Sequence, residues 1–233
     1  MSLLEVHQID TFIGQFHILE GVSVDVQPGQ ITVLLGRNGA GKTTTLRSIL
    51  GLTPPSSGEV RFRGERLNGR KPFQIAQMGI GYVPEHRAIF KELTVAENLR
   101  IAERRSGDLK ARLDLIFDLF PDLQRLYQLK GGQLSGGQQQ MLAIARALVP
   151  QNDLLLIDEP SEGLAPVIIS HLMAVIKRLA QTSTVLLVEQ NFRVASQLAD
   201  HYVIIDDGHS VQRGAMSDLL RDPATIQRYL GVA

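Results

Sequence analysis

The chain has 233 residues, and 24 Lys and Arg balance 24 Asp and Glu, so the formal net charge is zero. No run of basic residues is typical of a nucleic-acid surface, and we expect no nucleic-acid partner. The lack of cysteine excludes disulfides and thiolate metal sites, which suits the cytoplasm. The first residues do not resemble a secretory signal, and the longest apolar runs are too short to cross a bilayer. Any membrane connection is therefore expected through a partner.

The first part of the chain shows short alternating and apolar segments typical of β-strands. The expected strands lie at 4–9, 22–26, 31–35 and 59–63. A helix-like stretch at 45–50 ends at Gly51, and a turn rich in Pro and Ser follows it. This part of the chain predicts an antiparallel β layer beside the strand at 31–35.

Helical periodicity begins at about residue 94 and continues to about 129, with Pro121 expected to end one helix. A glycine-rich turn at 131–137 opens another helix. After Pro150, strands and helices alternate, which favours a parallel sheet. The expected strands of this part lie at 154–157, 184–188 and 202–205, and the last helix is expected to end near 230.

A glycine-rich run after the strand at 31–35 carries the strongest functional signal. It consists of Gly36, Arg37, Asn38, Gly39, Ala40, Gly41, Lys42, Thr43 and Thr44. A strand, a glycine loop and a helix start, in this order, are the context of a P-loop, in which backbone N–H groups surround phosphate. Lys42 is expected to reach the β- and γ-phosphates, and the Thr43 hydroxyl to ligate Mg²⁺. The run predicts a site for ATP or GTP.

Two carboxylates follow the apolar strand at 154–157. The carboxyl ends of buried parallel strands border the crevice where α/β sheets bind ligands, so Asp158 and Glu159 are expected beside the nucleotide. Asp158 would hold Mg²⁺, and Glu159 would polarise the water that attacks the γ-phosphate. The alternative is that these acids merely cap the next helix.

A second helix start follows Leu134. Its residues are Ser135, Gly136, Gly137 and Gln138. Ser135 is a common N-cap residue, and this structural role is one interpretation. The P-loop already offers one phosphate site, however, so a second bare helix N-terminus indicates a second anion. That anion would be the γ-phosphate of ATP held by another copy of the chain.

The order of P-loop, Leu-Ser-Gly-Gly-Gln and Asp-Glu resembles the ATP-binding cassette (ABC) superfamily over essentially the whole chain. The resemblance implies an α/β fold with a RecA-like P-loop NTPase core, an antiparallel β layer and an inserted helical subdomain. It implies one nucleotide-binding domain over 1–233, with the core and β layer at 1–85 and 143–233 and the helical subdomain at 86–142. It also implies ATP and Mg²⁺ as cofactors. The active form would be a head-to-tail dimer, with each ATP between one P-loop and the other subunit's signature serine.

A finer resemblance is to ATPase subunits of branched-chain amino acid importers and of similar amide or urea importers. It is carried by Tyr82-Val83-Pro84-Glu85, Ile89-Phe90, Glu92-Leu93-Thr94-Val95, Glu97-Asn98-Leu99, Asp158-Glu159-Pro160-Ser161, Gly163-Leu164-Ala165-Pro166, Val188-Glu189-Gln190-Asn191 and Tyr229-Leu230-Gly231. The resemblance implies a cytoplasmic ATPase, peripheral on the inner face of the cell membrane. Its partners would be two permease subunits, a second ABC ATPase (itself or a paralogue) and, indirectly, an extracytoplasmic solute-binding protein. Residues 86–100 would face the permease.

Three positions depart from the general cassette pattern but recur in the importer subgroup. Glu85 stands where a glutamine is usual, and its carboxylate could still meet Mg²⁺. Ala165 replaces an aspartate. Gln190 replaces the switch histidine; its amide can donate to a γ-phosphate oxygen but cannot take up a proton near neutral pH. The resemblance therefore still implies an active enzyme, with Glu159, Lys42 and Gln190 as catalytic residues.

Two further departures concern the base and the loop after the acids. Ile13 stands where a ring normally stacks on adenine, so the contact falls to Ile13 itself, Phe12 or Phe16. Glu162 replaces a residue that is usually apolar, and the sequence offers no account of its effect.

Three other functions share these motifs. An exporter of lipid or lipopolysaccharide has the same core, although Glu85 and Gln190 argue against it. A soluble cassette that acts on ribosomes or DNA usually has two cassettes or a long coiled coil, and this chain has neither. A regulatory sensor would bind ATP without hydrolysing it.

Overall fold

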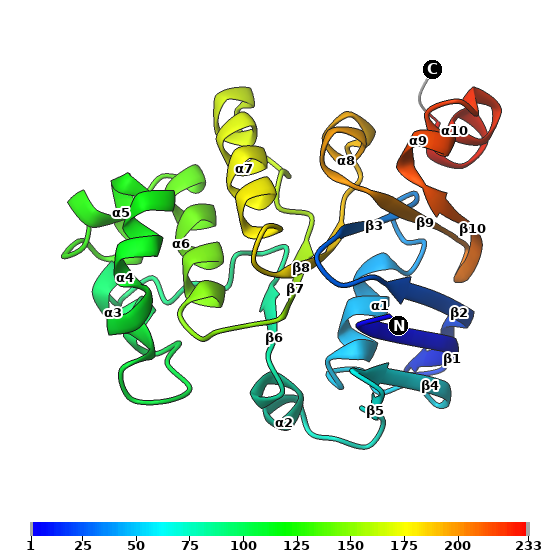
Figure 1. Cartoon of the computed structure of the whole chain (residues 1–233), viewed down its shortest axis with the longest axis horizontal. Coiled ribbons are helices and arrows are strands. Elements are labelled where there is room, and N and C mark those ends of the chain that lie inside the picture. The colour runs from blue at the N-terminus through cyan, green and yellow to red at the C-terminus, as the bar shows by residue number, and fades with distance from the viewer. Residues whose placement is uncertain (1, 232–233) are drawn as a thin grey trace.

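The computed structural model describes residues 2–231, whose strands form two sheets (Figure 1). One sheet is antiparallel and contains the N-terminal strands, and the other is mostly parallel. Helices lie on the parallel sheet, and a further group of helices stands at the end away from the antiparallel sheet (Figure 1). The predicted antiparallel β layer is therefore present beside a parallel α/β core.

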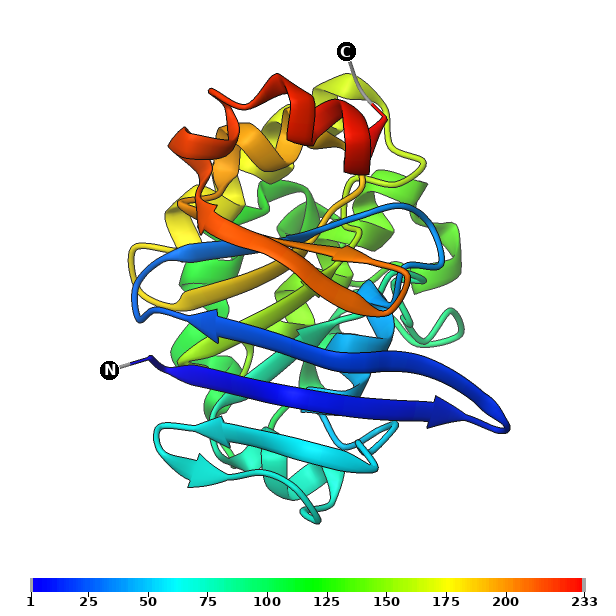
Figure 2. The same ribbon diagram turned by 90° about the vertical axis from the view of Figure 1, so that its right-hand side faces the viewer.

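The antiparallel sheet has the strand order β2-β1-β4-β5 and buries one face (Figure 2). Its strands are β1 (Leu4–Ile13), β2 (Phe16–Val26), β4 (Ser57–Phe62) and β5 (Glu65–Arg66). Leu4, Val6 and Val24 are fully buried. They alternate with more exposed neighbours, as in a strand with one wet face. Both β1 and β2 are longer than expected and meet in a hairpin.

The second sheet has the order β10-β9-β3-β8-β7-β6. Its strands are β3 (Ile31–Leu35), β6 (Ile80–Val83), β7 (Leu154–Asp158), β8 (Thr184–Val188), β9 (His201–Asp206) and β10 (His209–Ala215). Every residue of β3, β7 and β8 is buried, which explains their continuous apolar sequences. Their register aligns Leu34 and Asp158 with Val188, so the three strands end at one edge.

Helices cover both faces of the parallel sheet. The first helix, α1 (Lys42–Ile49), lies between the two sheets, where Leu46 and Ile49 are fully buried (Figure 1). The opposite face packs against α6 (Gly136–Leu148), α7 (Pro166–Leu179) and α8 (Phe192–Leu198). The sheet thus separates two apolar cores.

The remaining helices of the middle segment gather beside α6 (Figure 1). They are α3 (Val95–Arg100), α4 (Asp108–Leu119) and α5 (Pro121–Arg125), and a 3₁₀ turn at Gly131–Gln133 leads into α6. Pro121 begins α5 directly after α4 ends, as its fixed φ and missing N–H require. The predicted subdomain boundary between 142 and 143 falls inside α6. The division into core and helical subdomain stays a prediction.

Four short elements were not expected from the sequence pattern: β5, β6, α2 (Pro72–Gln77) and α9 (Met216–Leu219). The last helix of the described residues is α10 (Pro223–Leu230), which ends at residue 230 as expected. β6 contains Gly81 and follows Gly79, which weakens its strand pattern, and α2 buries only Ile75. Within residues 2–231, no helix has the length and apolar character needed to span a membrane.

Candidate functional site

The P-loop at 36–44 connects the end of β3 to the first turn of α1. Two of its glycines lie in close contact with strands β9 and β2. Gly36 has φ of 148°, and a Cβ there would collide with the carbonyl oxygen of Ile205 in β9. Gly41 has φ of 108°, and a Cβ there would lie 2.6 Å from Cδ2 of Leu19 in β2. Glycine alone fits both positions. The loop therefore brings the N-terminal N–H groups of α1 to the edge where β3, β7 and β8 end.

Lys42 ties this loop to the end of β7. Its side chain is only 4% exposed, and Nζ donates to the carbonyl oxygens of Gly36 and Arg37 at 3.0 Å each. The same Nζ lies 3.4 Å from Oε1 of Glu159. The predicted phosphate-binding lysine and the predicted base are thus adjacent.

Asp158 is fully buried behind the first turn of α1. Oγ1 of Thr43 donates to its Oδ1 at 3.1 Å, and the hydroxyl of Tyr82 donates to Oδ2 at 3.3 Å. Burial raises the pKa of Asp158 to about 6 although both hydrogen bonds act to lower it, and the charges of Glu159 and Glu85 raise it further. Burial also raises the pKa of Tyr82, so its hydroxyl stays a donor. A cation close by would favour the ionised carboxylate.

A cavity of about 280 Å³ opens above these groups. Its lining residues are Asn38, Gly39, Gly41, Lys42, Thr43, Thr44, Glu85, Glu159 and Glu162. The structure therefore brings the P-loop, Glu85 and Glu159 into one cavity, and places Glu162 there too. The oxygens of Thr43, Asp158 and Glu85 are of the type that Mg²⁺ prefers, so the donor set fits that ion.

Gln190 borders a neighbouring cavity of about 410 Å³. That cavity is lined by Glu159, Ser161, Glu162, Gly163, Glu189, Gln190 and Asn191, so the two cavities share Glu159 and Glu162. The predicted switch residue thus lies next to the predicted base, on the loop that follows β8.

Ser135, Gly136, Gly137 and Gln138, the signature residues, line neither of the two cavities described above. The Ser135 side chain caps α6 by accepting from Gln138 N at 3.3 Å, and Gln138 Oε1 accepts from Ser135 N at 2.9 Å. This reciprocal capping box is the structural role that the sequence left open. Gly136 and Gly137 form the first turn of α6. This turn therefore lies outside both cavities.

The β1–β2 hairpin places its aromatic rings on two opposite faces. Thr11 faces α1, because its hydroxyl lies 2.9 Å from Oγ of Ser48. Strand alternation puts Ile13 on that same face, and Phe16 pairs directly with Ile13. Phe12 points the other way, where its ring stacks on His17 with centroids 4.2 Å apart.

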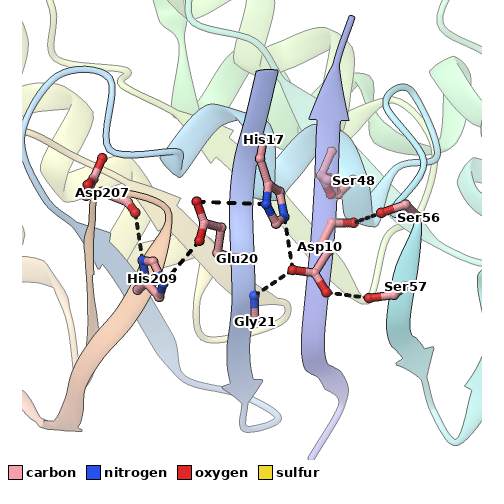
Figure 3. Close-up of polar contacts among 10 residues, drawn as sticks. Asp10, His17, Glu20, Gly21, Ser48, Ser56, Ser57, Asp207 and His209 are labelled. Carbon is pink, nitrogen blue, oxygen red and sulfur yellow. Dashed lines mark hydrogen bonds and ion pairs between the residues drawn. The ribbon is translucent and has the colours of Figure 1, made fainter. Parts of the chain in front are cut away.

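His17 belongs to a polar network on the outer face of the antiparallel sheet (Figure 3). Its Nε2 lies 3.1 Å from Asp10, and its Nδ1 lies 3.9 Å from Glu20. Glu20 also lies 3.6 Å from His209, which comes from β10. This network holds the ring pair of Phe12 and His17 away from the α1 face.

The comparisons with known proteins agree with this geometry. The family model described as ABC transporter matches residues 19–162. The chain is 40% identical over 232 residues to the high-affinity branched-chain amino acid transport ATP-binding protein BraG of Pseudomonas aeruginosa, covering 98% of this chain and 100% of the relative. The chain belongs to the ABC transporter family.

Other members of the ABC transporter family match along the same length. The probable branched-chain amino acid transport ATP-binding protein LivF of Archaeoglobus fulgidus is 36% identical over 234 residues, with 99% of each chain covered. A solved ATP-binding cassette of an ABC transporter, in its ADP conformation, has a TM-score of 0.86 at 26% identity and is covered over 100% of both chains. The predicted fold class, the ABC ATPase fold, is confirmed, and the chain is an ATP-binding cassette of the ATPase type.

Two residues of the cassette site escaped the sequence reasoning. In the sequence, Tyr82 and Glu189 belong only to segments that resemble the importer subgroup. In the structure, the Tyr82 hydroxyl donates to Asp158, and Glu189, next to Gln190, is only 1% exposed. A polar residue that directly follows a buried strand is the signal that could have found Glu189. Tyr82 lies inside β6, a strand that the sequence pattern did not predict. No account of Ala165 emerges beyond its place as the residue before α7.

The raised pKa of Asp158 predicts a pH-dependent stability of the cassette without Mg²⁺ or nucleotide. The pKa of Asp158 is about 6 in the folded protein, above its ordinary value of 3.8. The carboxyl therefore contributes stability that is fully present below pH 3.8 and is lost as the pH rises through about 6. Asp158→Asn removes this loss. Relative to the variant, the free energy of unfolding of the wild type should fall by about 2 kcal/mol between about pH 4 and about pH 7.

Denaturant unfolding in a chelator at several pH values measures this shift. Asp114→Asn, on the exposed face of α4, is the matched control and should leave the pH dependence unchanged. Parallel pH curves for wild type and Asp158→Asn would show that burial does not hold this carboxyl in its neutral form.

Proposed function

We propose that this chain is the ATP-hydrolysing subunit of an ABC importer for branched-chain or other hydrophobic amino acids. The observation that carries the catalytic part is the single cavity in which Lys42 and Glu159 lie 3.4 Å apart beside the P-loop. The full-length similarity to relatives named as branched-chain amino acid transport ATP-binding proteins supports the importer part.

The residues at the two adjoining cavities would have different roles in binding and hydrolysing ATP. P-loop N–H groups from Gly39 to Thr44 and the ammonium of Lys42 bind the β- and γ-phosphates. Glu159 orients and polarises the attacking water as the general base. Gln190, on the adjoining loop, donates its amide to a γ-phosphate oxygen.

Magnesium would be held by Thr43, Asp158 and Glu85, the last two directly or through water. The ion supplies charge neutralisation between phosphate oxygens when it is bound. Tyr82 keeps the Asp158 carboxyl oriented towards Thr43 through its hydroxyl. Glu162 adds a further carboxylate to the same cavity.

A second cassette, either another copy or a paralogue, would complete the site. Its Ser135, Gly136, Gly137 and Gln138 would meet the γ-phosphate through the N-terminus of α6, because no signature residue lines this chain's own cavity. Closure of the dimer would then drive two permease subunits, with residues 86–100 of the helical subdomain (86–142) facing them. An extracytoplasmic binding protein would deliver the solute, and this subunit would sit in the cytoplasm on the membrane's inner face.

Adenine would rest on the α1 face of the β1–β2 hairpin. Ile13 and Phe16 share that face, whereas the ring of Phe12 is engaged by His17 on the other. Phe16 is also 65% exposed, so its ring is available for stacking. This arrangement favours Ile13 and Phe16 over Phe12 as the contacts to the base.

Replacing Phe16 should therefore weaken nucleotide binding. Because stacking of a ring on a base contributes about 1–3 kcal/mol, Phe16→Ala is expected to raise the ATP dissociation constant roughly tenfold. Isothermal titration with ATP measures the change, and Phe12→Ala is the matched control, expected to stay within about twofold of wild type. Equal effects of the two substitutions, or a larger effect of Phe12→Ala, would contradict the assignment.

Glu159→Gln should separate binding from chemistry. A general base contributes about 10²- to 10⁴-fold to the rate, so ATP hydrolysis should fall by about that factor while ATP still binds. The variant should also favour the ATP-bound dimer, which size-exclusion chromatography with ATP detects. Hydrolysis at the wild-type rate would refute the role of Glu159 as the base.

The transporter assignment predicts which proteins accompany the chain in the cell. A tagged copy captured from detergent-solubilised native membranes should recover two integral permease subunits, with or without a second cassette. An untagged strain treated in the same way is the control. Recovery from the soluble fraction alone, or with ribosomes, would rule out the importer.

A further inference from the structure

Glu189 is a buried carboxylate that the catalytic roles above do not use. It follows β8 directly, and only 1% of its surface is exposed. Its Oε1 accepts from the backbone N–H of Ser161 at 3.3 Å, and its Oε2 accepts from the backbone N–H of Asn191 at 3.1 Å. One side chain thus joins the loop after Glu159 to the loop that carries Gln190.

Glu159 has an unusual backbone conformation at this place. Its φ is 41°, in the left-handed region that is unfavourable for a residue with a Cβ. Such a conformation persists only where the surroundings over-determine it. Its own N–H donates to Val188 O at 2.9 Å, which fixes the peptide before Glu159.

The bond from Ser161 to Glu189 fixes the chain on the other side of Glu159. Only Pro160 lies between the two anchored residues, so the backbone of Glu159 is held from both directions. Without the bond to Glu189, the loop after Glu159 keeps the hydrogen bond from Glu162 N to Glu159 O at 3.3 Å. The Glu159 carboxylate, 3.4 Å from Nζ of Lys42, would then be less firmly positioned. Glu189 itself is anchored by its N–H, which donates to Leu34 O in β3 at 3.3 Å.

We propose that Glu189 is a positioning residue for ATP hydrolysis, which holds Glu159 in its left-handed conformation and couples its loop to that of Gln190. The inference rests on the proposed role of Glu159. A carboxylate suits this task because it only accepts hydrogen bonds, and the two backbone groups that it joins are both N–H donors. Burial raises the pKa of Glu189, while hydrogen bonding with the Ser161 side chain and with the N–H groups of Asn191 and Ser161 acts to lower it.

Glu189→Gln tests the inference with almost no change of shape. The glutamine amide turns one acceptor into a donor that faces a backbone N–H, so one of the two loops is released. Because misplacing a catalytic group by about 1 Å can cost about 10²-fold, kcat should fall roughly 10- to 100-fold. The dissociation constant for ADP should stay within about threefold of wild type, because the P-loop is unchanged.

A double-mutant cycle separates positioning from general destabilisation. If Glu189 acts through Glu159, Glu189→Gln should lower the residual single-turnover rate by less than about threefold in the Glu159→Gln background. Glu103→Gln is the matched control, because Oε1 of Glu103 also accepts from two backbone N–H groups, those of Gly107 and Leu109. This control should leave kcat unchanged in full-length protein.

Each failure has its own signature. A wild-type kcat for Glu189→Gln, beside a slow Glu159→Gln, would overturn the inference about Glu189 alone. The same fold loss in both backgrounds would mean that Glu189 is structural and does not act through Glu159. A wild-type rate for Glu159→Gln would remove the proposed base and this inference with it.

Discussion

The pairing of β8 with both β3 and β7 is the constraint on which the whole site depends. Val188, the last residue of β8, aligns with Leu34 of β3 on one side and with Asp158 of β7 on the other. Parallel strands in register end at the same edge, so the P-loop after β3, the acids at the end of β7 and the loop of Gln190 after β8 lie close together. The backbone continues this alignment past the sheet, because Glu159 donates to Val188 O and Glu189 donates to Leu34 O. Chemistry from three distant parts of the chain is thereby concentrated at one edge.

Several carboxylates surround the buried ammonium group of Lys42 at this edge. Glu85, Glu159 and Glu162 line the same cavity as Lys42, and Asp158 lies buried behind Thr43. Carboxylates crowded together and shielded from water are costly to ionise, which explains the raised pKa of Asp158. The combination of an anion-binding loop and oxygen-rich walls suits a metal-bound triphosphate better than a bare anion.

Much of the fold follows from the sequence because the central strands are apolar on both faces. The runs that form β3, β7 and β8 are recognisable by composition, and their alternation with helices predicts a parallel sheet. β6 is not predictable in this way, because it is a short edge strand that contains a glycine. The site is predictable to a similar extent. The P-loop and the acids carry local motifs, whereas Tyr82 becomes relevant only because β6 pairs with β7 and brings its hydroxyl to Asp158.

Residue types and their spacing are enough to predict the chemistry of this protein: a P-loop, two acids at the end of a buried strand and a second glycine-rich helix start. They also determined the family, because these motifs occur in one order. Only the folded chain shows on which face of a strand each side chain lies and which loops are joined by hydrogen bonds. The sequence places Ile13 at the adenine position, with Phe12 and Phe16 as alternatives. Strand alternation and the stacking of Phe12 on His17 favour Ile13 and Phe16 over Phe12. Glu189 acquires a role only through hydrogen bonds to residues that folding brings to it, since a buried carboxylate is defined by its donors and not by its neighbours in the chain.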